Sequence, residues 1–291
     1  MSHRPPDFES YWAEVDRELA RYPAAPELEV LPLRSTDFCT VYAAHITSLG
    51  PYRIFGYLSV PTGGGPSPGL IETPRYGSVN HVPAYELRQR YVVLTIMHRG
   101  QRLADQPFRA SYPGLLTLGI EDADRYVYRG IVADCLRGAE FLLDHPDVDG
   151  RRVGIVGDDL ALITAARRPR FAAVQVTGLM LYRLMEACAR TDVYPLEEVN
   201  ETLRTFPNQR DAIARTVALF DPVHHAPDVT APTLVTAGDA GTLGGPEWLE
   251  PLAEALHQRV QLYRLSHEGR TDHAWLDRWM AEQLGAISPT P

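Results

Sequence analysis

Between residues 69 and 284 the chain alternates short apolar runs with segments of helical periodicity. The helical segments are expected at 122–143, at about 159–166 and at roughly 271–284. This alternation is typical of an α/β protein, in which a mostly parallel sheet carries helices on both faces. The runs predicted to be strands are Gly69–Glu72, Tyr91–Met97, Val153–Val156, Ala172–Val176, Thr233–Ala237 and Gln261–Leu265.

The remaining segments fit around this sheet. Residues 8–22 place apolar and charged side chains at helical spacing, which predicts an amphipathic N-terminal helix. Thr40–Ser48 and Arg53–Val60 read as a β-hairpin joined at Leu49-Gly50-Pro51. Residues 182–219 are helical in pattern and lie between two predicted strands, as an insertion over the edge of the sheet does. No repeat or linker divides the chain, so residues 1–291 are expected to form a single domain.

Composition excludes some classes of function. The net charge of −9 argues against a nucleic-acid surface, since phosphate binding requires clustered basic residues. The three cysteines are far apart and odd in number, which favours free thiols in a reducing compartment. No long apolar run or signal-type segment is present. We therefore expect a soluble, cytoplasmic protein with no membrane partner.

The strand predicted at Val153–Val156 runs directly into Gly157-Asp158-Asp159-Leu160-Ala161. Many hydrolases carry the pattern G-x-S-x-G at such a place, where the serine nucleophile sits on a strained turn between a strand and a helix. Here Asp159 takes the serine position and Ala161 that of the last glycine. The sequence around Asp159 therefore matches a nucleophilic turn, but the serine hydroxyl is replaced by a carboxyl group.

Further landmarks occur in an order that resembles the acetylxylan esterase and cephalosporin C deacetylase family (carbohydrate esterase family 7). The resemblance extends over almost the whole chain, although the stretch after Gln101 is shorter than expected for the family. It implies an α/β-hydrolase fold, a small-molecule substrate and a homo-oligomer. The landmarks are Phe8-Glu9-Ser10-Tyr11-Trp12, Arg53–Leu58, His98-Arg99-Gly100-Gln101, Gly119-Ile120-Glu121-Asp122, Tyr126–Arg129, Asp147-Val148-Asp149, Tyr194-Pro195, Tyr263-Arg264 and His267-Glu268.

The resemblance also implies roles for particular residues. His267 follows the strand Gln261–Leu265, where the family has its catalytic histidine. The family's acid falls near Gly241, and Asp239 is the carboxylate that would replace it if the glycine-rich loop bends suitably. The backbone N–H of Leu160 and the region of Tyr76 would hold the oxyanion. Asp159 occupies the position of the nucleophile.

A carboxylate at this turn changes the expected chemistry. An oxyanion site favours developing negative charge, and Asp159 would fill that electropositive place at a helix N-terminus. Ordinary serine ester hydrolysis is therefore discounted. Asp159 and His267 are instead expected to form an acid–base pair that acts on a small metabolite, and the chain is expected to be an enzyme with a non-serine mechanism.

Three alternatives remain open. Asp159 would be a covalent carboxylate nucleophile, or His267 would activate a water molecule for deacetylation. The third is a catalytically inactive homologue that acts as a binding protein. No cofactor is expected, and no metal, because His224-His225 lacks a third ligand at suitable spacing.

Overall fold

The computed structural model describes residues 4–286. Its centre is a nine-stranded sheet in the order β1-β2-β3-β5-β4-β6-β7-β8-β9. The first three strands pair antiparallel, as do β3 and β5, and all the remaining pairs are parallel. The strands are β1 (Glu27–Val30), β2 (Cys39–Thr47), β3 (Arg53–Pro61), β4 (Ser67–Glu72), β5 (Val92–Ile96), β6 (Val148–Gly157), β7 (Ala173–Val176), β8 (Thr233–Ala237) and β9 (Val260–Arg264).

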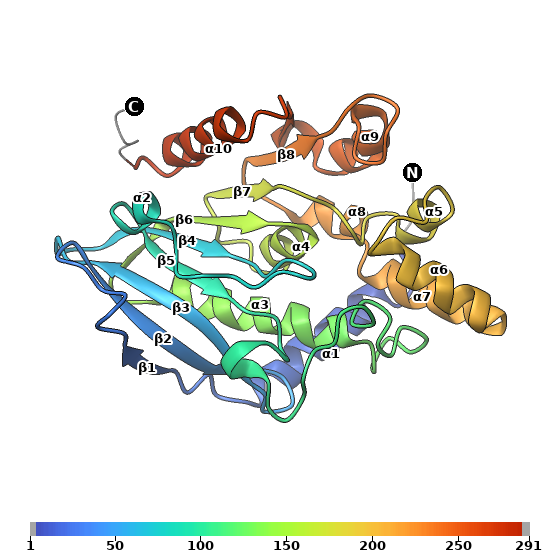
Figure 1. Cartoon of the computed structure of the whole chain (residues 1–291), viewed down its shortest axis with the longest axis horizontal. Coiled ribbons are helices and arrows are strands. Elements are labelled where there is room, and N and C mark those ends of the chain that lie inside the picture. Colours follow the sequence, from blue (N-terminus) through green and yellow to red (C-terminus); the bar gives the residue numbers. More distant parts are fainter. Residues whose placement is uncertain (1–3, 287–291) are drawn as a thin grey trace.

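Helices lie on both faces of this sheet, with short 3-10 turns between some of them (Figure 1). The α-helices are α1 (Phe8–Ala20), α2 (Tyr85–Arg88), α3 (Val127–Leu143), α4 (Asp159–Arg167), α5 (Leu184–Cys188), α6 (Leu196–Thr205), α7 (Arg210–Leu219), α8 (Pro222–His225), α9 (Pro246–Ala255) and α10 (Gly269–Gln283). The 3-10 turns are η1 (Arg102–Ala104), η2 (Pro207–Gln209), η3 (Ala226–Asp228) and η4 (His257–Arg259).

The central strands are apolar on both faces because each face is covered. Successive side chains of a strand point to opposite sides of the sheet. Thus Ile71 and Leu94 pack in the cluster that contains α3 and α4, while Leu70 and Val93 pack against α10. This two-sided burial produces the continuous apolar runs of the sequence, as parallel strands require.

The boundaries differ most from the sequence-based prediction in two places, and elsewhere they shift by at most two residues. The helix predicted at 122–143 begins at Val127, because residues 119–126 form turns in which the Asp122 side chain accepts the Asp124 N–H at 2.9 Å. The strand predicted at Val153–Val156 extends from Val148 to Gly157. The short strand β1 and helices α2, α8 and α9 were not predicted. β1 is exposed along its whole length, so it carries no alternating apolar signal.

The helical segment predicted at 182–219 is found as α5, α6, η2 and α7. Figure 1 shows these helices at the side of the molecule to which the arrowheads of β6 and β7 point. They share a core cluster with α1 and α3, in which Trp12, Ile213 and Phe220 are fully buried. The insertion is therefore anchored to the body of the protein beside the carboxyl edge of the sheet, where ligands bind in open α/β sheets.

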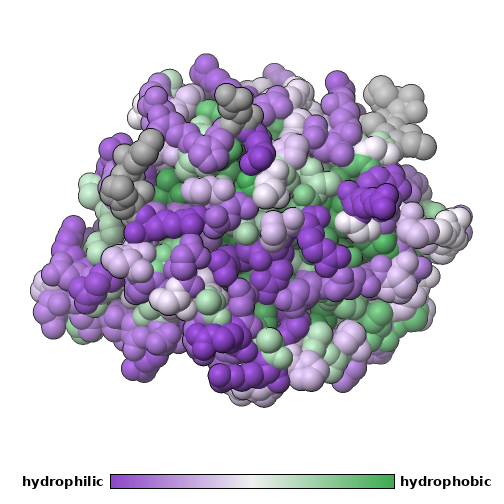
Figure 2. Space-filling model, turned by 180° about the vertical axis from the view of Figure 1, so that it is seen from behind, coloured by the Kyte–Doolittle hydropathy of each residue, from purple (hydrophilic) through white to green (hydrophobic). Residues whose placement is uncertain are grey.

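The surface of the molecule is mixed in character. The face in Figure 2 is mainly hydrophilic, with hydrophobic residues visible between the polar ones. Among the helices of residues 4–286, none combines the length and the apolar character that a membrane crossing requires. All three cysteines are buried as free thiols.

Candidate functional site

The turn after β6 joins the centre of the sheet to α4. Gly157 is required at its start, because a Cβ there would lie 1.8 Å from the Thr73 hydroxyl oxygen. Asp158 is the N-cap residue of α4, and its carboxylate accepts the Leu160 N–H at 3.1 Å. No residue from 157 to 161 has a positive φ. The turn is thus a capped helix start that lacks the backbone strain of a nucleophilic turn.

The Asp159 carboxylate faces the protein interior. Its residue is only 1% exposed, and its two oxygens accept the backbone N–H groups of Met180 at 2.6 Å and Tyr182 at 3.2 Å. Met180 and Tyr182 belong to the loop that follows β7. Asp159 therefore connects the start of α4 to the neighbouring loop, and both of its oxygens are used in doing so.

The two adjacent carboxyl groups of this turn influence each other. Burial raises the pKa of Asp159 well above its ordinary value, and the negative charge of Asp158 raises it further. The N–H groups from the loop after β7 act in the opposite direction and lower this pKa. Burial also raises the pKa of Asp158, against the N–H of Leu160 and the charge of Arg75. The surroundings of both carboxyl groups therefore favour their protonated forms.

At the predicted oxyanion site, the Leu160 N–H and the Tyr76 hydroxyl are engaged in other bonds. The Leu160 N–H donates to Asp158, as described above. The Tyr76 hydroxyl donates to Glu198 at 2.6 Å, and it accepts the N–H of Leu116 at 3.2 Å. Burial is the largest cause that raises the pKa of Tyr76, and the hydrogen bond to Glu198 raises it further. The other Glu198 oxygen accepts the Gly114 N–H at 2.7 Å, so this buried carboxylate ties α6 to two loops.

Tyr76 is part of an aromatic cluster beside the insertion. Its ring centroid lies 5.1 Å from that of Tyr112 and 6.1 Å from that of Tyr194. The Gln101 amide donates to the Tyr112 hydroxyl at 2.9 Å, and Tyr194 is 52% exposed. Tyr194 is the exposed member of the cluster, while Tyr76 and Tyr112 are half-buried behind it.

His267 and Asp239 are brought together by the loops after β9 and β8. The His267 Nε2 atom lies 3.4 Å from an Asp239 carboxylate oxygen, and both side chains are more than half exposed. Arg264 also contacts Asp239, at 3.4 Å. His267 has φ +62, in the left-handed region that few residues with a side chain adopt.

The loop that carries His267 is held by Asp272, in the first turn of α10. One Asp272 oxygen accepts the backbone N–H of Ser266 at 2.9 Å, its hydroxyl at 2.8 Å and the Tyr263 hydroxyl at 2.8 Å. The bond from the Ser266 N–H is the main reason that the pKa of Asp272 is lowered. This carboxylate fixes the loop just before His267.

The structure therefore brings together only part of the predicted constellation. His267 pairs with Asp239, whereas no nitrogen of its ring lies within 4.0 Å of an Asp159 oxygen in the described part of the chain. Two cavities, of about 450 and 280 Å³, lie elsewhere, because none of the five predicted site residues lines either of them. Within residues 4–286, no group of three His, Cys, Asp or Glu side chains is placed to hold a metal ion.

Three residues of this region were missed from the sequence: Asp158, Glu198 and Asp272. Asp158 carries a local signal, because aspartate before a helical run is a favoured N-cap. Asp272 lies in the first turn of a predicted helix, which is a favourable place for a carboxylate. Glu198 has no such signal, since its partners Tyr76 and Gly114 are distant in sequence.

Comparison with known proteins places the chain in a family. The profile of the acetyl xylan esterase family (AXE1) matches residues 1–248. The acetyl esterase Axe7A of Xylanibacter ruminicola is 26% identical over 251 residues, which are 80% of this chain. The chain spans 56% of the length of that relative.

Two solved structures have the same fold along nearly their whole length. The acetyl xylan esterase from Paenibacillus sp. R4 superimposes with a TM-score of 0.83 at 21% identity, covering 97% of this chain and 96% of that one. Acetyl xylan esterase 1 from Thermoanaerobacterium sp. JW/SL YS485 gives the same score and identity, with 97% and 95% covered. The α/β-hydrolase fold expected from the sequence is thereby confirmed, and the chain belongs to the acetyl xylan esterase (AXE1) family.

Proposed function

We propose that this chain binds an acetylated carbohydrate without cleaving it, as a member of its family that has lost acyl-enzyme chemistry. The observation that carries the proposal is the state of the turn after β6. Asp159 is buried with both oxygens bonded to backbone N–H groups, and the Leu160 N–H is bonded to Asp158. A serine hydrolase needs a reachable nucleophile and free oxyanion donors at this place.

The acid–base pairing of Asp159 with His267 has less support. A general base must come within hydrogen-bond reach of its partner or of the substrate, directly or through one water. Asp159 is hydrogen-bonded to the loop after β7, and the His267 Nε2 atom contacts Asp239. Asp159 is better explained as a residue that joins α4 to the loop after β7.

The aromatic cluster supports the choice of ligand. Tyrosine rings combine an apolar face with a polar tip, which suits a ligand that has both hydroxyl and acetyl groups. Tyr76, Tyr112 and Tyr194 supply three such rings beside the insertion. The names of the relatives refer to acetyl esters and acetyl xylan, and an acetylated xylo-oligosaccharide is the ligand we propose.

Hydrolysis of p-nitrophenyl acetate tests the loss of catalysis. We expect no turnover above buffer from the wild-type chain, from Asp159→Ser or from His267→Ala. The serine variant is expected to be silent because the Leu160 N–H stays bonded to Asp158 and His267 stays paired with Asp239. An acetyl xylan esterase with its serine intact serves as the positive control. Wild-type turnover that disappears in His267→Ala would overturn the proposal.

Calorimetric titration with acetylated xylo-oligosaccharides tests the binding. Replacing the exposed Tyr194 by alanine is expected to weaken it about fivefold to tenfold, because one ring face is lost. Phe206→Ala is the matched control, since Phe206 is 49% exposed at the other end of α6. Equal loss in both variants, or no binding by the wild type, would contradict the proposed ligand.

A second candidate is favoured by the contact between His267 and Asp239. In a Ser-His-Asp triad the acid orients the ring through Nδ1 and leaves Nε2 to the nucleophile. Here Asp239 lies 3.4 Å from Nε2, which leaves Nδ1 as the ring nitrogen for a water molecule. In this alternative His267 activates a water molecule that removes an acetyl group directly. It predicts wild-type turnover that is lost in His267→Ala and reduced in Asp239→Asn. The same p-nitrophenyl acetate assay therefore separates the two candidates.

A further inference from the structure

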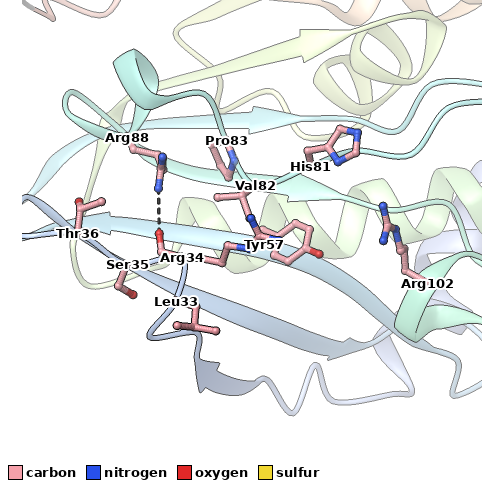
Figure 3. A pocket seen from close by; sticks show the side chains of 10 residues that line it. All are labelled: Leu33, Arg34, Ser35, Thr36, Tyr57, His81, Val82, Pro83, Arg88 and Arg102. Carbon is pink, nitrogen blue, oxygen red and sulfur yellow. Dashed lines mark hydrogen bonds between the residues drawn. The ribbon is translucent and has the colours of Figure 1, made fainter.

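The cavity of about 450 Å³ lies over the antiparallel half of the sheet. Its wall comes from the loop between β1 and β2, from Tyr57 on β3, from His81–Pro83, from Arg88 in α2 and from Arg102 in η1 (Figure 3). In this view Arg34 and Arg88 lie on one side of Tyr57, and His81 and Arg102 lie on the other. Pockets of this size accommodate small organic ligands.

The wall carries an excess of positive charge. Of the ten described residues that line the cavity, three are arginines and none is acidic. Most arginines elsewhere in the chain have a carboxylate partner, for example Arg99 with Asp134 at 2.6 Å. Within residues 4–286, Arg34, Arg88 and Arg102 have no carboxylate oxygen within 4.0 Å. In a chain of net charge −9 this is a local reversal of sign.

The guanidinium groups retain free hydrogen-bonding capacity. No hydrogen bond from the side chain of Arg34 or of Arg102 occurs within the described residues. Arg88 donates from Nη1 to the Arg34 carbonyl at 3.0 Å, and its buried Nε atom has no partner in the described part of the chain. A planar guanidinium matches the paired oxygens of carboxylates and phosphates, so these donors suit an oxyanion.

We propose that this cavity binds a small organic molecule with a multivalent oxyanion group, of the phosphate-ester or polycarboxylate type. The anionic group contacts the guanidinium groups of Arg34 and Arg88 on one side of Tyr57, and Arg102 adds positive charge on the other side. The organic part lies against Tyr57 and Pro83, which supply the aromatic and apolar part of the wall. This site shares no residue with the predicted catalytic constellation or with the tyrosine cluster, and it is independent of the proposed function.

Calorimetric titration of the full chain at low ionic strength tests the site, with glucose 6-phosphate and citrate as probes. We expect one of the two to bind, which identifies the anionic group, and glucose to give no heat. The Kd of the probe that binds is expected to rise with added NaCl, because salt screens the attraction between the anion and the arginines. Arg34→Gln and Arg102→Gln are each expected to raise the Kd about tenfold. Both side chains are exposed, so the fold is not at risk.

Arg210→Gln is the matched control. Arg210 is exposed, lies outside the cavity and has no carboxylate partner within the described residues, so removing it changes the net charge equally. An equal loss of affinity in this variant would show general charge attraction and overturn the site. Absence of binding by both probes would overturn it too. Inorganic phosphate that binds as tightly as glucose 6-phosphate would contradict the organic part of the ligand.

Discussion

The turn after β6 and the loop after β9 follow parallel strands and lie at the same edge of the sheet, yet their polar groups are held very differently. Asp159 is almost fully buried and accepts two backbone N–H groups. His267 is mostly exposed and has one carboxylate contact, at 3.4 Å. The first arrangement is typical of a residue that maintains the fold, and the second leaves the ring available to a ligand.

The two regions lie apart along the carboxyl edge of the sheet. β7 and β8 lie between β6 and β9, so three interstrand spacings, roughly 14 Å of backbone, must be bridged. A catalytic pair at this edge requires an outward-facing side chain from the turn and a loop that reaches back over the sheet. Here Asp159 points inward and His267 pairs with Asp239 on the adjacent loop, so neither half of the bridge is formed.

The largest effect is expected from Asp159→Ala. This change leaves the N–H groups of Met180 and Tyr182 buried without acceptors, which is expected to lower the free energy of unfolding by about 2–4 kcal/mol. Asp159→Asn retains one acceptor oxygen and should lose less. Urea denaturation of the two variants and the wild type measures the difference. Unchanged stability in Asp159→Ala would mean that the turn after β6 is not a structural joint.

A smaller effect concerns pH, and it has opposite signs in the two regions. The pKa of Asp159 is raised by burial, so the folded state holds its proton more tightly than the unfolded one. Stability therefore falls as pH rises from the ordinary aspartate value, about 4, towards this raised pKa. The pKa of Asp272 is lowered by the Ser266 N–H. The contribution of Asp272 to the stability of the fold is complete above about pH 4 and is lost as pH falls through the lowered pKa.

Urea midpoints of the wild type, Asp159→Asn and Asp272→Asn between pH 3 and 8 check both signs. Asp159→Asn should remove the decline on the way to neutral pH. Asp272→Asn should remove part of the loss at acid pH. Identical profiles for all three proteins would show that neither carboxyl group is linked to folding as its surroundings imply.

The smallest effect is expected from Asp239→Asn. Its contacts with His267 and Arg264 are both 3.4 Å long, and all three side chains are more than half exposed. Exposed ion pairs of this kind contribute little, so the free energy of unfolding should be almost unchanged. Urea denaturation beside Asp159→Ala gives the contrast directly. A loss as large as that of Asp159→Ala would remove the distinction between the two regions.

Much of the fold was predictable because its signals are local. The continuous apolar strands, the 182–219 insertion and the amphipathic helix α1 follow from periodicity and burial on a covered sheet. The exposed strand β1 was not predictable in this way, because its side chains contact solvent and its pairing with β2 depends on the rest of the sheet. The start of α3 shifted because Asp122 favours a turn over the first helical residues.

For the candidate site, the sequence by itself determined that Asp159 stands at the turn after β6 and that a histidine follows β9. These facts depend on order along the chain, which local patterns and family resemblance report well. Only the tertiary structure decided that the Asp159 carboxylate turns towards Met180 and Tyr182. It also decided that Glu198 accepts a hydrogen bond from the Tyr76 hydroxyl, and that arginines from three separate segments line one cavity. Direction and contact depend on which loops pack beside a residue, and those neighbours come from distant parts of the sequence.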